Sequence, residues 1–131
     1  MDYPFLTRCP PDQGKTTSLL LDRDEDTAMW LSRLVNFVTE YRAYVVNGEV
    51  VALCHYEGDS TLSVDKQVVL KAAREYTGSP TAYAIDWGLS DDGRTLIVEC
   101  NDGWAIGAYR GINGSDYFRF LQTRWTELTT G

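Results

Sequence analysis

The chain has 131 residues, 44% of them hydrophobic and 12% aromatic, and its formal net charge is −7. This length and composition predict one folded domain, residues 1–131, with its own core. The acidic balance excludes nonspecific binding to a nucleic-acid backbone, which needs clustered Lys and Arg. We expect no membrane partner, because no stretch is apolar enough to span a bilayer and no signal-peptide pattern is found. Three cysteines without metal-ligand spacing indicate a reducing compartment, the cytoplasm.

The first part of the chain predicts a helix and a β-hairpin. Asp22 or Asp24 can cap a helix that continues to about Leu34. An Asn-Gly pair, the strongest short hairpin signal, predicts paired strands over residues 39–46 and 49–56. Upstream of the helix, a Gly-Lys-Thr-Thr run lacks the first glycine and the preceding strand of a P-loop, so we reject a P-loop here.

The second part predicts a helix, a second hairpin and a last helix. Ser63 or Asp65 can cap the first of these helices, which Gly78 ends, and the hairpin covers residues 81–101. The last helix, from about Asp116, is expected to bury Tyr117, Leu121, Trp125 and Leu128. The order predicts an α+β fold, in which two hairpins build an antiparallel sheet and the helices pack on one face.

Acidic and amide side chains converge on the second hairpin. With a Ser-Asp-Asp-Gly turn, Asp86 lies opposite Ile97, and Glu99 is a diagonal neighbour about 7–8 Å away. Asn101 shares the face of Glu99, because residues two apart on a strand point the same way. Exposed strand ends are often rich in such residues, but Asp86 lies in mid-strand among apolar neighbours, where aspartate is unfavourable. The set suits Mg²⁺, and burial of Asp86 in a salt bridge with an arginine would count against it.

The first hairpin adds an arginine to this expectation. A two-residue turn pairs Arg42 with Leu53 and Glu40 with His55, which places Glu40, Arg42, Tyr44 and His55 on one face. Arg42 can form a surface ion pair of little energetic value. Beside the second hairpin, a clamp for phosphate or acyl phosphate is the better interpretation, because the guanidinium fork matches such anions. A single histidine such as His55 is more often structural than catalytic.

These motifs resemble the ATP-grasp family. Hydrophobic-Asp-hydrophobic, a turn and hydrophobic-Glu-x-Asn are similar to its metal-binding end, and Glu40-Tyr41-Arg42 resembles its acidic-x-Arg strand. Residues 102–109 resemble in particular the small ATP-grasp proteins of phages and bacteria. The resemblance implies ATP and Mg²⁺ as cofactors. The site residues it implies are Asp86, Glu99 and Asn101 as metal ligands, Arg42 as catalytic and ATP-binding, and Glu40, Arg8 and Lys15 as ATP-binding residues.

The resemblance also implies a function, a carboxylate-amine or carboxylate-thiol ligase or a piece of one, with an unknown carboxylate and an amine as substrates. Two alternatives stay open, a nucleotide-binding module without catalysis, such as a phage protein that sequesters a nucleotide signal, and an interaction protein. The chain is short for the family, so we expect no acceptor-binding N-terminal domain and a tendency to form homo-oligomers. The expected location is the cytoplasm of a bacterium or of a phage-infected cell. We expect Asp86→Asn to abolish Mg²⁺-dependent nucleotide binding with little loss of stability.

Overall fold

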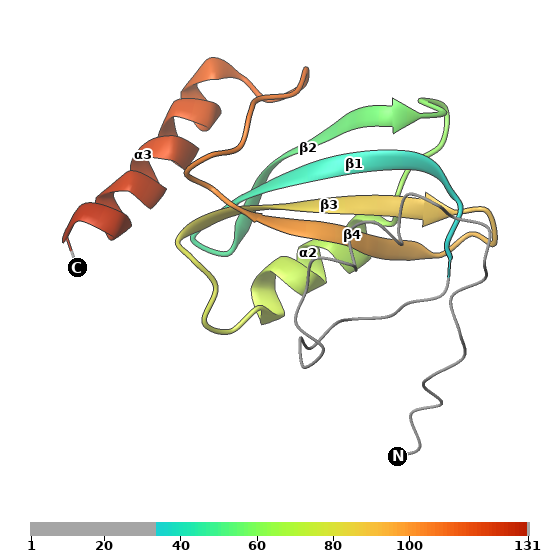
Figure 1. Cartoon of the computed structure of the whole chain (residues 1–131), viewed down its shortest axis with the longest axis horizontal. Helices are drawn as coiled ribbons and strands as arrows, with labels where there is room; N and C mark the ends of the chain where they lie inside the picture. The colour runs from blue at the N-terminus through green and yellow to red at the C-terminus, as the bar shows by residue number, and fades with distance from the viewer. Residues whose placement is uncertain (1–33, 131) are drawn as a thin grey trace, which may run out of the picture. The chain divides into compact units, whose positions relative to one another are not determined.

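The computed structural model describes residues 34–130, which belong to one compact unit. Four antiparallel strands make one sheet in the order β2-β1-β3-β4, and two helices pack against it (Figure 1). This confirms the α+β class. No helix in the described part of the chain is long and apolar enough to cross a membrane. The elements are β1 (Phe37–Val46), β2 (Glu49–Gly58), α2 (Lys66–Glu75), β3 (Ala82–Ser90), β4 (Thr95–Asp102) and α3 (Gly114–Thr130). The predicted helix before Leu34, Arg8 and Lys15 lie outside the described residues.

The turn of the first hairpin follows from its two residues. Asn47 and Gly48 both have positive φ angles, 50° and 78°, as a type I′ turn requires. The turn pairs Val46 with Glu49, as predicted. The strand that enters this turn, β1, lies in the middle of the sheet, between β2 and β3.

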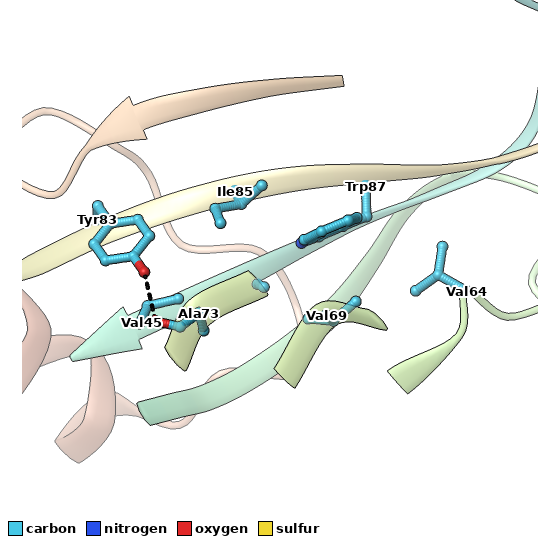
Figure 2. Close-up of a cluster of buried hydrophobic side chains, with 8 residues drawn as sticks. Val45, Val64, Val69, Ala73, Tyr83, Ile85 and Trp87 are labelled. Atoms are coloured by element: carbon cyan, nitrogen blue, oxygen red, sulfur yellow. Dashed lines mark hydrogen bonds between the residues drawn. The ribbon is translucent and has the colours of Figure 1, made fainter. Parts of the chain in front are cut away.

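Helix α2 covers one face of the sheet. Asp65 caps it, because its side chain accepts a hydrogen bond from the backbone N–H of Gln67 at 2.8 Å. Between the helix and the strands lies a buried apolar cluster (Figure 2), and the Tyr83 hydroxyl donates a hydrogen bond to the carbonyl of Ala73. The cluster consists of Ala43, Val45, Val64, Val69, Ala73, Tyr83, Ile85 and Trp87.

Helix α3 packs on the opposite face, which corrects the expectation that the helices share one face. Figure 1 shows α2 under the sheet and α3 on the other side, toward one end. A second buried cluster lies there, made of Tyr44, Val46, Cys54, Ala82, Ala84 and Phe120. The reason is that the central strands carry continuous buried runs, residues 43–46 and 82–87, whose side chains alternate between the faces. Both faces therefore need cover.

The face of α3 that contacts the sheet also differs from the expected one. Phe120 is fully buried, and Tyr117 and Leu121 flank it, whereas Trp125 and Leu128 are each 49% exposed. Trp125 stacks on Trp104 at 4.4 Å between ring centroids instead. The apolar residues of α3 cover more of the helix surface than the sheet can contact. The sequence pattern alone therefore did not define which side of α3 faces the sheet.

Candidate functional site

A buried ion pair joins the two central strands. Arg42 on β1 and Asp86 on β3 are direct cross-strand partners, 7% and 2% exposed. Arg42 Nε donates to Asp86 Oδ1 and Nη2 donates to Oδ2, each at 2.6 Å. The hydrogen bond to Asp86 raises the pKa of the guanidinium further above its ordinary value. This bidentate geometry is the strongest form of an arginine-carboxylate contact.

The pair corrects one expectation about Asp86. Both carboxylate oxygens accept hydrogen bonds from Arg42, so Asp86 is buried in a salt bridge and not a free carboxylate. Such a salt bridge counts against Asp86 as a metal ligand in this arrangement. Among residues 34–130, no group of three or more His, Cys, Asp and Glu side chains is placed to hold a metal ion.

Glu99 and Asn101 lie next to this pair on β4. Glu99 is the direct partner of Asp86, and its Oε1 lies 3.9 Å from Arg42 Nη2. Asn101 Nδ2 donates to Glu99 Oε1 at 2.8 Å. The expected pairing of Asp86 with Ile97 is wrong for two reasons. The turn is displaced by one residue, so that Leu89 pairs with Thr95, and a bulge at Val98 shifts the register by one more.

Magnesium fits the exposed part of this group. Glu99 is 57% exposed at its side chain, and an amide oxygen of Asn101 belongs to the same strand face. Mg²⁺ in nucleotide sites is often held by one or two carboxylates together with substrate phosphates. Glu99 and Asn101 offer oxygen ligands of that kind, whereas both oxygens of Asp86 are used by Arg42.

Glu40 joins the site through a tyrosine that the sequence did not single out. The Tyr56 hydroxyl donates to Glu40 Oε2 at 2.6 Å, and the Tyr56 ring centroid lies 5.8 Å from Arg42 Cζ. Burial, together with the bond to Glu40, raises the pKa of Tyr56. The expected place of His55 beside Arg42 is wrong: His55 pairs with Tyr41 and therefore lies on the other face.

The cause is a pair of register shifts in the first hairpin. Arg42 pairs with Cys54 and not with Leu53, and Glu40 pairs with Glu57. Tyr56 is the extra residue at the second shift, and its ring lies on the Arg42 side. Bulges of this kind leave no clear mark in a single sequence, so neither Tyr56 nor the position of His55 could be predicted.

A second tyrosine covers the guanidinium. Tyr109 lies in the 103–113 segment between β4 and α3, and its ring centroid is 4.6 Å from Arg42 Cζ. Tyr109 ends the stretch 102–109, whose sequence resembles the small ATP-grasp proteins. Trp104 in the same segment stacks on Trp125 of α3 instead. Together these groups form an "arginine cluster" consisting of Glu40, Arg42, Tyr56, Asp86, Glu99, Asn101 and Tyr109.

The comparisons with known proteins agree with the motifs. A family model described as an ATP-grasp domain matches residues 7–120, most of the chain. No curated protein and no solved structure matches the chain significantly. The matched range contains both hairpins, helix α2 and the segment with Tyr109. The chain therefore belongs to the ATP-grasp domain family.

Proposed function

We propose that the protein binds ATP with Mg²⁺ at the arginine cluster and uses it to activate a carboxylate. Membership of the ATP-grasp family supports ATP binding and a ligase-like function at the level of the superfamily. The observation that carries the proposal is the joining of Arg42, Asp86 and Glu99 across three adjacent strands. A buried guanidinium fork beside an exposed carboxylate combines an anion-binding group with an oxygen ligand for a cation.

Each residue has a separate role in this proposal. Glu99 and Asn101 would hold Mg²⁺, which neutralises phosphate charge when it is bound. Arg42 binds the transferred phosphoryl group through donors that Asp86 does not use. Asp86 orients Arg42 and offsets its charge, and a direct metal role for Asp86 stays a prediction. Arg8 and Lys15 remain proposed nucleotide contacts from the family resemblance.

Calorimetry with Mg²⁺ and ATP tests the site. The wild-type protein should bind, and Glu99→Gln should weaken binding at least about tenfold, because it removes the exposed negative charge of the metal site. Glu75→Gln is the matched control, since Glu75 is an exposed carboxylate at the end of α2, on the other side of the sheet. Equal affinity in the wild type and Glu99→Gln would place the nucleotide elsewhere.

Turnover separates the ligase from a binding module. ADP release in the presence of carboxylates and an amine is expected for the wild type, and Arg42→Lys should lose it while keeping most of the nucleotide affinity. Lysine keeps the charge but cannot form the bidentate fork. The burial of Arg42 favours the second candidate, binding without catalysis, for which the same substitution lowers affinity and no turnover is seen at all. Wild-type binding and turnover in Arg42→Lys would remove Arg42 from the site.

A further inference from the structure

Two groups fix the orientation of the Arg42 guanidinium. Asp86 accepts hydrogen bonds at one edge of the fork, and the Tyr109 ring lies 4.6 Å from Cζ, within the range of a cation–π contact. All N–H donors of a guanidinium lie in its plane. A carboxylate at one edge therefore sets its rotation, while an aromatic ring near its centre restrains its tilt.

The Tyr109 ring is itself held in place. It stacks on Tyr56 with centroids 4.8 Å apart and 10° between planes, and Tyr56 donates to Glu40. The backbone N–H of Tyr109 donates to the Tyr44 hydroxyl at 2.9 Å, and that hydroxyl donates to the Gly107 carbonyl at 2.8 Å. These contacts join the 103–113 segment to β1 and β2. The ring is thus preorganised over Arg42 although Tyr109 is 37% exposed.

One unused donor of Arg42, the second N–H of Nη2, lies on the side of the metal-ligand pair. Asp86 accepts from two of the five N–H groups, and among the described residues no other hydrogen bond from this guanidinium is found. Nη2, the nitrogen 3.9 Å from Glu99 Oε1, lies on the side of β4. A phosphate that accepts from this nitrogen would therefore lie beside Glu99 and Asn101.

We infer that Tyr109 is a positioning residue for phosphate binding: its ring holds the plane of Arg42 so that the unused donors face the phosphates of the nucleotide. The inference rests on the proposed function, and assigns to the 103–113 segment a part in nucleotide affinity. Loss of the ring leaves Asp86 and the more distant Tyr56 ring, 5.8 Å from Cζ, as the restraints on Arg42, and part of the binding energy is then used to order the side chain.

Calorimetry with Mg²⁺ and ATP on three tyrosine variants tests the inference. Tyr109→Leu should weaken binding by about three- to thirtyfold, the range of a partly buried cation–π contact. Tyr109→Phe keeps the ring and should stay within about twofold of the wild type. Tyr76→Leu is the control, because Tyr76 is similarly exposed (46%) but contacts Tyr83 on the other face.

The NMR signal of Arg42 Nε–H gives a readout without nucleotide. It should be the same in Tyr109→Phe as in the wild type, apart from small ring effects, and should move in Tyr109→Leu. If the leucine variant does not fold, Tyr44→Phe, which removes the hydroxyl's contacts with the Tyr109 N–H and the Gly107 carbonyl, should move the signal and weaken binding in the same direction.

The outcomes separate this inference from the proposed function. If the wild type binds ATP and Tyr109→Leu binds it with the same affinity, the inference is overturned and the proposed function is not. Failure of the wild type to bind ATP would overturn the proposed function, and the inference about phosphate with it, whatever the Arg42 signal does. Weaker binding in Tyr109→Leu that Tyr109→Phe restores, with the matching change of the Arg42 signal, supports both.

Discussion

The two faces of the sheet are built from the same central strands but differ in chemistry. The odd-numbered residues of β1 and β3 under α2 are apolar, as with Val45, Ile85 and Trp87. The even-numbered residues under α3 begin apolar, as with Tyr44, and change to the charged pair Arg42 and Asp86 further along. Among the described residues, the α2 face holds an apolar cluster, whereas the other face is apolar where α3 covers it and charged beyond. The change marks the candidate site.

The ion pair gives the largest expected difference between the faces. Asp86→Leu should lower the free energy of unfolding by about 3–5 kcal/mol, because it leaves the Arg42 guanidinium buried without an anion. Adding Arg42→Met should recover most of the loss, since an apolar pair needs no counter-charge. Urea denaturation measures both. Trp87→Ala on the α2 face is the control. It should lower the free energy of unfolding by a comparable amount, about 3–5 kcal/mol, and adding Arg42→Met should not restore that loss.

If the double variant is no more stable than Asp86→Leu, the charges do not act as a pair.

This prediction also corrects the expectation of little stability loss in Asp86→Asn. That expectation assumed carboxylates that repel one another, whereas the structure pairs Asp86 with Arg42. Neutralising Asp86 therefore removes an attraction.

The Tyr44 hydroxyl should have a smaller effect. Tyr44 belongs to the apolar cluster under α3, and its hydroxyl links the Tyr109 N–H to the Gly107 carbonyl. Tyr44→Phe should cost about 1–3 kcal/mol, because a partly buried N–H loses its acceptor. Hydrogen exchange at the Tyr109 amide should speed up while the amides of α2 keep their rates. Faster exchange in α2 as well would mean that the two faces unfold together.

The smallest effect concerns the end of the sheet where α3 contacts β4. Arg124 on α3 donates to both Asp102 oxygens, and these hydrogen bonds lower the pKa of Asp102. The carboxylate then stabilises the fold above its unfolded pKa, about 3.9, and this contribution is lost as pH falls through the lower folded pKa. Arg124→Gln should lower the melting temperature at pH 7, and the difference should shrink below about pH 4. A difference independent of pH would show that the arginine acts through packing.

The sequence predicted those parts of the fold that depend on local signals. The Asn47-Gly48 turn, the cap at Asp65 and the second hairpin are confirmed. These signals, together with the apolar patterns between them, were enough to predict the fold class. The side of the sheet that α3 covers depends on the path of the 103–113 segment, which no local pattern encodes.

The site could be predicted in part, for a reason of register. Strand parity brought Asp86, Glu99 and Asn101 to one face. Two single-residue shifts, one at the turn and one at Val98, moved Glu99 from a diagonal to a direct partner of Asp86. The first register shift, at Val51, removed His55 from the face of Arg42. The partner of Asp86 was also not foreseen, because cross-strand pairing between hairpins is a long-range contact.

Chemical-shift mapping by NMR with ATP and Mg²⁺ tests the central claim, that the charged face is the nucleotide site. The account predicts shifts that saturate with nucleotide at Arg42, Glu99, Asn101 and Tyr109, and that disappear when EDTA removes the metal. The α2 face, reported by Trp87 and its neighbours, should show none. Saturating shifts confined to the α2 face, or no shifts at the arginine cluster at any nucleotide concentration, would contradict it.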